Sequence, residues 1–336
     1  MSKKKDEQKL RKTSVGGQAL IEGVMMNGPK GAALSVRKPD GSIYTEMRDF
    51  KRLGQKYKFF RIPIIRGVVS FIESMVLGYK CLMDSAELSG QLEAEEETED
   101  MSKLDKWLND HLGPKMMAVI SAIAMVLGVA LAVILFMYAP TKLVDLCDNY
   151  LFSSWLEIHN LHPLCEGIIR IVIFVVYMYL VSLMNDIKRV YMYHGAEHKT
   201  IFCYEAGLDL TVENVRKMKR FHPRCGTSFT FLVLLISILC SSILSYILHV
   251  VGATVIYENS ILWVCVKILI LPLVMGLSYE AIKYSGRHDN LFTKIISAPG
   301  LWLQRVSVKE PTDDMIEVAI ASVKAVITDN PEDDTL

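Results

Sequence analysis

Long apolar runs dominate the hydrophobic pattern of this chain. A helix needs about 20 residues to cross the hydrocarbon core of a bilayer, and four runs approach or exceed that length with few charged residues inside them. The first run, "MMAVISAIAMVLGVALAVILFMY", contains no charged residue at all. The pattern therefore predicts an α-helical integral membrane protein with four transmembrane helices. The predicted spans cover residues 116–138, 164–185, 226–248 and 259–279.

The charges between the spans predict the orientation of the chain. Segment 186–225 is rich in Lys and Arg, whereas segment 139–163 contains only Lys142. Positively charged loops of membrane proteins remain in the cytosol. We therefore expect a four-helix membrane domain at 115–280 with a cytosolic insert at 186–225, and both termini on the cytosolic side of a plasma membrane.

Smaller elements are predicted outside the spans. Two short strands are expected around the turn-forming residues Pro39-Asp40-Gly41, and the charged residues of segment 61–90 lie on one helical stripe, which favours an interfacial helix over a fifth span. After the last span, Thr312 is followed by apolar residues at helical spacing, which predicts a C-terminal amphipathic helix. The predicted segments are a disordered basic tail at 1–14, a cytosolic β-containing unit at 15–60, the interfacial helix at 61–90, an acidic linker at 91–114 and a cytosolic C-terminal segment at 281–336.

Charge and cysteine content restrict the possible binding partners and disulfides. The formal net charge is +0, and nucleic-acid binding requires a concentrated basic face, so no nucleic-acid partner is expected. Cys203 and Cys225 lie in the cytosolic insert and are expected to stay reduced. Cys147 and Cys165 share the outer segment, where the sequence alone does not establish whether they form a disulfide.

The stretch "YMYHGAEHKTIFCYE" carries the strongest chemical pattern. His194 and His198 are four residues apart with Glu197 beside the second histidine, the H-x-x-E-H arrangement of inverted zincins. If the second span continues past the membrane surface as a helix, the two imidazoles lie one turn apart and can occupy adjacent vertices of a Zn²⁺ site. Glu197 would then orient or deprotonate a bound water. A divalent metal, with zinc expected, is the cofactor that this pattern predicts.

The remaining ligands must come from elsewhere in the chain. His222 and Cys225 lie immediately before the third span, at the same membrane face, and are the leading candidates. Glu205 follows His198 by seven residues, about 10 Å of helical rise, so it is expected to support the site rather than to bind the metal.

Three alternative interpretations of these residues stay open. The two histidines and Glu197 could form an ordinary polar helix end. Cys225 could be a nucleophile whose pKa is lowered by neighbouring cations. In the glycine-rich stretch 15–31, Glu22 could reach the histidines as an acidic ligand or base, or the stretch could be an edge strand.

Charged residues inside the predicted spans form a second group. Glu166 and Arg170 are four residues apart, and Lys267 lies at a comparable depth of the fourth span. Intramembrane charges are costly and usually paired. A structural ion-pair network is favoured over a transport path, since no inverted repeat is present.

Several strings of the chain carry a family resemblance: "GGQALIEGVMMNGP", "VRKPDGSI", "YHGAEHKTIFCYE", "LTVENVRKMKRFHPRCGTSF" and "PGLWLQRVSVKEP". They resemble the YqhQ-like family of bacterial integral membrane proteins of unknown function. The resemblance runs from about residue 15 to residue 327 and implies a bacterial plasma-membrane protein. Members of that family are commonly labelled predicted metal-dependent enzymes, which implies a role here for His194, Glu197, His198, His222 and Cys225.

Two hypotheses for the function follow from the sequence. The first is a membrane-embedded metal-dependent hydrolase with its site at the cytosolic boundary and a lipid or a membrane protein as substrate. The second is a non-catalytic membrane factor in membrane-protein insertion or quality control, in which the polar cluster is architectural. Neither hypothesis identifies a fixed protein partner.

Overall fold

The computed structural model describes residues 11–48, 53–91, 114–152, 161–288, 290–328 and 330–334. Its internal contacts divide the chain into two compact units, each described by itself below. Unit 1 comprises residues 1–92, 178–232 and 278–336, and unit 2 comprises residues 93–177 and 233–277. The acidic run 93–100 and the first ten residues of the basic tail lie outside the described residues.

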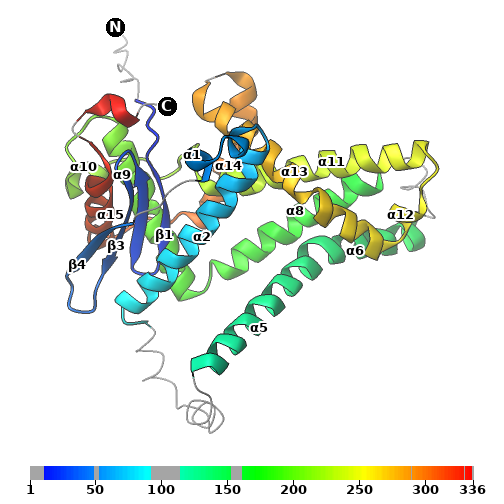
Figure 1. Ribbon diagram of the computed structural model, residues 1–336, viewed down its shortest axis with the longest axis horizontal. Helices are drawn as coiled ribbons and strands as arrows, with labels where there is room; N and C mark the ends of the chain where they lie inside the picture. Colours follow the sequence, from blue (N-terminus) through cyan, green and yellow to red (C-terminus); the bar gives the residue numbers. More distant parts are fainter. Residues whose placement is uncertain are drawn as a thin grey trace. The chain divides into compact units, whose positions relative to one another are not determined.

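An antiparallel four-stranded sheet forms the centre of unit 1 (Figure 1). Its strands are neighbours in sequence order: β1 (Gly16–Leu20), β2 (Gly23–Gly28), β3 (Gly31–Arg37) and β4 (Ile43–Arg48). The predicted hairpin at Pro39-Asp40-Gly41 is the β3–β4 connection, in which Gly41 has a φ of 83°. The glycine-rich stretch before it forms a second hairpin, with β1 at the edge of the sheet.

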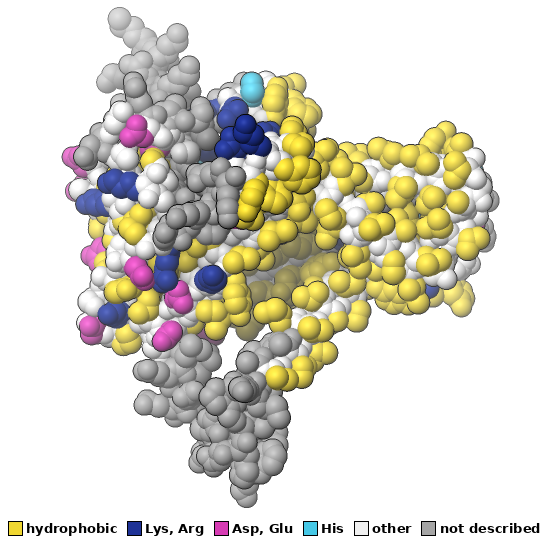
Figure 2. Space-filling view, in the orientation of Figure 1, with side chains coloured by type: hydrophobic (Ala, Val, Ile, Leu, Met, Phe, Trp, Pro, Cys, Tyr) yellow, Lys and Arg dark blue, Asp and Glu magenta, His cyan; other side chains and the backbone are white. Residues whose placement is uncertain are grey.

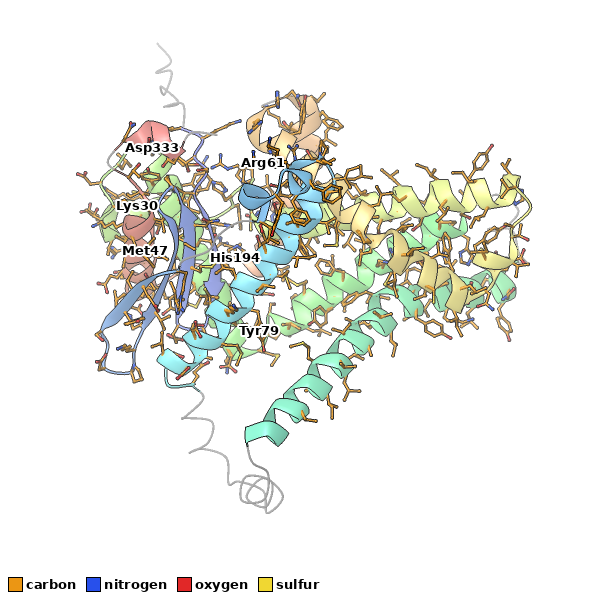
Figure 3. All side chains as sticks on the ribbon, in the orientation of Figure 1. Lys30, Met47, Arg61, Tyr79, His194 and Asp333 are labelled. Carbon is orange, nitrogen blue, oxygen red and sulfur yellow. The ribbon has the colours of Figure 1, made fainter. Side chains whose placement is uncertain are left out.

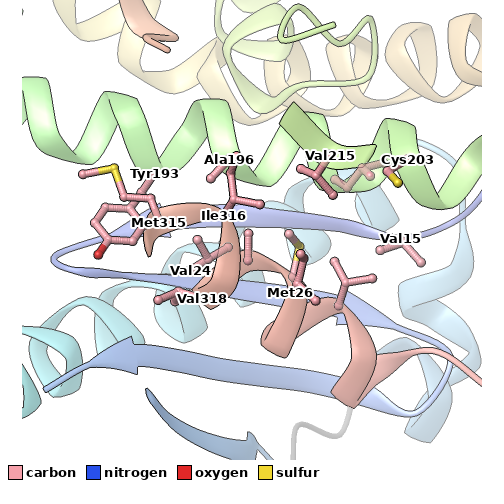
Figure 4. Packing of buried hydrophobic residues seen from close by; sticks show 14 of the residues in the cluster. Val15, Val24, Met26, Tyr193, Ala196, Cys203, Val215, Met315, Ile316 and Val318 are labelled. Carbon is pink, nitrogen blue, oxygen red and sulfur yellow. The ribbon is translucent and has the colours of Figure 1, made fainter. Parts of the chain in front are cut away.

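Helices cover both faces of this sheet. On one face, α9 (Asn185–Glu205) and α15 (Asp313–Val326) pack on Val24, Met26 and Ala33, and Figure 4 shows this core from close by. On the other face, α2 (Ile65–Leu88) packs on the alternate side chains of the same strands, including Leu34. The alternation follows from the period of two along a strand, and it places α9 beside the sheet.

The C-terminal segment contains the predicted amphipathic helix and one helix that the sequence analysis missed. In α15, Thr312 is the N-cap residue and Ile316 and Val323 are fully buried, as predicted. The missed helix is α14 (Leu291–Ser307). Its start was readable from the sequence, because Asn290 and Thr293 form a capping box, but Pro299 interrupts the helical pattern.

Four helical segments of the described chain are long and apolar enough to cross a membrane: Ile123–Leu151, His162–Val181, Gly226–Val250 and Ser260–Arg287. They confirm the four predicted spans, and α2 is not among them. Figure 2 shows hydrophobic side chains over these helices. The helices are α5 (Pro114–Val133), the π-helical turn η2 (Ile134–Tyr138), α6 (Ala139–Cys147), the π-helical turn η3 (Asp148–Phe152), α8 (His162–Val181), α11 (Gly226–Val250) and α13 (Ser260–Arg287). Short elements complete the described chain: α1 (Leu53–Lys56), η1 (Lys58–Arg61), α10 (Val212–Arg216), α12 (Val255–Glu258) and η4 (Pro331–Asp334).

Two predicted boundaries are corrected by the structure. The helix of the first span continues beyond residue 138, through α6 and the π-helical turn η3, to Phe152. The second span does not continue into the histidines: α8 ends at Val181 and α9 begins at Asn185 with an extended residue, Met184, before it. His194 and His198 therefore lie on a separate helix.

Three buried charged residues of unit 2, Glu166, Arg170 and Lys267, form one network. Glu166 accepts hydrogen bonds from Arg170, from Lys267 Nζ at 2.6 Å and from Trp263 Nε1 at 3.2 Å, and Lys267 also donates to Thr141 at 2.7 Å. One buried carboxylate thus serves two buried cations. In the same unit, Cys147 and Cys165 are free thiols.

Candidate metal centre

The candidate site lies entirely in unit 1 and is built on α9. Because the spacing of four residues is slightly more than one helical turn, His194 and His198 face the same way, with ring centroids 4.4 Å apart. His194 is labelled in Figure 3, on α9. The local expectation from the sequence therefore holds, although the helix is a separate one.

Cys225 joins the two histidines. Its Sγ lies 3.1 Å from Nε2 of His194, and the ligand atoms of His194, His198 and Cys225 all lie within 4.8 Å of one another. In a tetrahedral zinc site with bonds of 2.0–2.3 Å, neighbouring ligand atoms are about 3.3–3.7 Å apart. Two imidazole nitrogens and one sulfur at these separations form a group that could hold a metal ion.

The other ring nitrogen of each histidine is engaged by the backbone. Nδ1 of His194 donates to the carbonyl of Ser307 at 3.0 Å, and Nδ1 of His198 donates to the carbonyl of Arg220 at 2.6 Å. A proton on each Nδ1 leaves each Nε2 with its lone pair available. Metal-binding histidines are oriented in this way, by a hydrogen bond from the nitrogen that does not bind the metal.

A glycine permits the contact to Ser307. A Cβ at Gly195 would overlap the carbonyl oxygen of Lys309, so only glycine lets the segment after α14 lie directly on α9. Lys309 N–H donates to the carbonyl of Tyr191 at 2.9 Å, which fastens that segment to the helix. The glycine within the H-x-x-E-H stretch is therefore part of the support for His194.

Gln304 of α14 holds the segment that carries Cys225. Its side chain is fully buried, accepts from the N–H of His222 at 2.8 Å and donates to the carbonyl of His222 at 2.8 Å. Cys225 follows three residues later and directly precedes α11. The sequence analysis did not single out Gln304 or Ser307, because both belong to the helix that it missed.

The surroundings of the ligands favour metal-binding protonation states. Burial, together with the nearby His194, lowers the pKa of His198, so its imidazole is neutral near pH 7. Burial acts to raise the pKa of Cys225, but the His198 ring and the Thr227 hydroxyl, which donates to Sγ at 3.3 Å, outweigh burial and lower it. Metals bind the neutral imidazole and the thiolate, and both pKa shifts are in the direction of these forms.

Glu197 lies against the same group. Its side chain is buried beside Gly17 of β1, and burial raises the pKa of Glu197 to about 7, although the N–H of Gly17 and the His194 ring oppose that rise. Oε2 of Glu197 and Nε2 of His198 are buried and have no hydrogen-bond partner among the described residues. Buried polar atoms without partners are rare and require an explanation, and an ion or a water at this point would supply one.

His222 and Glu205 belong to a hydrogen-bond network next to the cluster of His194, His198 and Cys225. Nε2 of His222 lies 3.4 Å from Glu205, whose carboxylate also accepts from Arg224 and from the backbone and hydroxyl of Thr13 at 3.1 Å. Burial acts to raise the pKa of Glu205, but its contacts with His222 and Arg224 lower it overall. His222 is therefore adjacent to His198, with ring centroids 5.7 Å apart, but is not one of the three clustered ligands.

Glu22 is directed to a different partner. Its carboxylate accepts from Nε and an NH₂ nitrogen of Arg189 at 2.5 and 2.6 Å and from the hydroxyl of Tyr193 at 3.1 Å. It occupies the turn between β1 and β2 with a φ of 48°. The structure thus places Glu22 at a contact with an earlier part of α9 rather than beside His194 and His198.

A cavity of about 340 Å³ opens beside the clustered residues. Glu197, His198 and Cys225 form one part of its wall, and residues 14–18 and α2 form others. The cavity therefore provides open space next to the group that could hold a metal.

Comparison with known proteins gives a family and one curated relative. The sequence profile of DUF1385, described as a protein of unknown function, matches residues 62–329. The chain is 33% identical over 321 residues to "Uncharacterized protein YqhQ" of Bacillus subtilis (strain 168), an alignment that covers 93% of this chain and 92% of the relative. No solved structure matches significantly.

Proposed function

The chain belongs to the DUF1385 family, and from that premise we propose that it is a membrane-embedded, metal-dependent hydrolase whose site lies at the cytosolic membrane boundary. His194, His198 and Cys225 hold the metal, and Glu197 is the general base. One observation carries the proposal. Both imidazoles donate a hydrogen bond from Nδ1 to a backbone carbonyl and cluster with the same thiol, beside a buried carboxylate oxygen that has no partner among the described residues.

The donor set agrees with zinc. Nitrogen and sulfur ligands in a three-residue set are typical of catalytic zinc sites that keep a fourth position for water or substrate. A bound divalent metal would supply Lewis acidity and lower the pKa of a water molecule. The protein side chains would do the rest: Ser307 and Arg220 orient the imidazoles, and Glu197 takes a proton from the attacking water and returns it to the leaving group.

The distribution of Lys and Arg along the chain supports a site at the cytosolic membrane boundary. His194, His198 and Cys225 all lie in segment 186–225, which is rich in Lys and Arg and which the positive-inside rule assigns to the cytosol. Cys225 directly precedes α11, a candidate span. We assign this membrane to a bacterial plasma membrane, because the relative comes from a bacterium.

Metal analysis of the full-length protein tests this function. We expect about one divalent metal ion per chain after purification without chelators. We expect that the metal is lost in the double variant His194→Ala/His198→Ala and in Cys225→Ala. Matched controls are His288→Ala, an exposed histidine that follows α13 and bonds to the carbonyl of Tyr284, and Cys265→Ala, an exposed cysteine; both should keep the metal. Metal that persists in the ligand variants would refute the assignment.

The competing function is a non-catalytic membrane factor. The contact of 3.1 Å between His194 and Cys225 is also the distance of an ordinary thiol–imidazole hydrogen bond, so the trio could be architectural. If the wild-type protein contains no metal even after reconstitution with zinc, this second function is favoured. Glu197→Gln separates the two further, because it should keep the metal and abolish hydrolysis only if the protein is an enzyme.

A further inference from the structure

The edge of β1 borders the candidate site. β1 pairs with β2 on one side only, because it is the first strand in the sheet order. Five consecutive residues, 14–18, line the cavity. Successive side chains of a strand point to opposite faces, so a wall made of consecutive residues exposes the backbone edge rather than one face. Gly17 in the middle of this edge is exposed.

Two glycines of β1 line the cavity. A Cβ at Gly16 would meet no atom within 4 Å, so empty space lies beside this residue. A Cβ at Gly17 would overlap the carbonyl oxygen of Met25 and the sulfur of Met26 in β2 and would lie 3.2 Å from Cδ of Glu197, so glycine permits both close approaches. Glu197 lines the same cavity as residues 14–18. Because paired strands lie about 4.8 Å apart, a strand added beside Gly17 would pass next to the carboxylate of Glu197.

The rest of the cavity lining suits a peptide backbone. Ser70 and Ser74 of α2, Gln18 of β1 and Asn27 of β2 offer neutral hydrogen-bonding groups. The cation in the lining, Arg224, is already paired with Glu205. No other Lys or Arg of the described residues lines the cavity, and Glu73 adds a carboxylate, which disfavours an anionic lipid headgroup. The amide groups of an extended peptide need only neutral donors and acceptors.

We propose that the substrate of this site is an extended polypeptide segment that adds as a fifth strand to the edge of β1, with the bond to be cleaved beside Glu197. This inference rests on the proposed hydrolase function. Main-chain hydrogen bonds to an open strand edge are a general mode of peptide recognition. In the reaction one water is consumed, the peptide C–N bond breaks and a C–O bond forms. Glu197 passes a proton from the water to the leaving amine.

Binding of an unfolded polypeptide tests the proposal on the full-length protein in detergent. The probe is fluorescein-labelled α-lactalbumin that has been reduced and carboxymethylated, and the Glu197→Gln background prevents cleavage. We expect Gly16→Ile to weaken binding at least about tenfold, because its side chain would project into the space that Gly16 leaves in the cavity wall. Thr45→Ile, on the opposite edge strand β4, should bind as the parent protein does.

A second measurement does not depend on the folding of any variant. On addition of the probe to Glu197→Gln, amide hydrogen exchange should slow within residues 14–18 and not within β4. Equal binding by Gly16→Ile and the parent, or no protection of residues 14–18, would overturn the inference. Displacement of the probe by a short-chain phospholipid, with no protection of β1, would assign the cavity to lipid.

The metal content of the same preparations distinguishes the two proposals. Bound metal without binding of the polypeptide at β1 refutes the peptide substrate and leaves the metal-dependent hydrolase. Protection of β1 by the probe in a protein that binds no metal supports the edge as a polypeptide site and refutes the hydrolase.

Discussion

Nε2 of His194 and Sγ of Cys225 meet at 3.1 Å although 31 residues separate them in the chain. Nδ1 of His194 donates a hydrogen bond to the carbonyl of Ser307. Cys225 follows His222, whose backbone N–H and carbonyl are both hydrogen-bonded to the side chain of Gln304. Both supports come from α14 and its C-terminal end. The last third of the chain therefore determines whether these two side chains of segment 186–225 meet.

His222→Ala distinguishes between the two residues predicted to complete the metal site. We expect the variant to keep the metal, because His222 is engaged by Glu205, and to lose roughly 1–3 kcal/mol of stability with that hydrogen bond. Elemental mass spectrometry and thermal unfolding measure the two effects. Loss of the metal from a folded His222→Ala protein would make His222 a ligand.

Gly195→Ala should damage the site without touching a ligand. The added methyl group overlaps the carbonyl of Lys309, so the segment from Ser307 onwards must move and the hydrogen bond to His194 weakens. We expect a loss of stability of about 1–3 kcal/mol and a decrease in metal affinity of about 10–100-fold. Competition with a chelator measures the affinity. Gly226→Ala is the control, since a Cβ there has no neighbour within 4 Å; similar results for the two variants would contradict the close-contact argument.

Gln304→Ala should be strongly destabilising. It leaves the buried N–H and carbonyl of His222 without partners, at about 1–3 kcal/mol for each group. Because the same segment carries Cys225, metal affinity should decrease as well. Arg305→Ala, an exposed neighbour on the same helix, is the control for thermal unfolding. A Gln304→Ala protein as stable as this control would show that the clamp is dispensable.

The charge network of unit 2 predicts an asymmetry between two substitutions. Glu166→Ala removes the carboxylate that both buried cations, Arg170 and Lys267, contact, whereas Lys267→Met leaves the pair of Glu166 and Arg170 intact. We expect Glu166→Ala to cost about 3–5 kcal/mol and Lys267→Met distinctly less. Thermal unfolding in detergent compares them. An equal or larger effect of Lys267→Met, or a change in ion transport on its neutralisation, would contradict a purely structural network.

Patterns that depend on neighbours along the chain were predictable from the sequence. The four apolar spans follow from length and composition, and the facing of His194 and His198 follows from the period of a helix. The β3–β4 hairpin follows from Pro39-Asp40-Gly41 and the buried stripe of α15 from its apolar spacing. The continuation of this first helix beyond residue 138 was not predicted, because Pro140 and Lys142 interrupt the apolar run there.

The sequence by itself determined the membrane class of this protein, its spans and the two-histidine helix turn, because each depends on residues within a few turns of one another. Only the tertiary structure decided that Cys225 meets the histidines while His222 binds Glu205, and that Glu22 pairs with Arg189. These outcomes depend on packing between distant segments: the close approach at Gly195, the clamp of Gln304 and the open edge of β1. Such contacts arise from the shapes of surfaces that come together only when the chain folds.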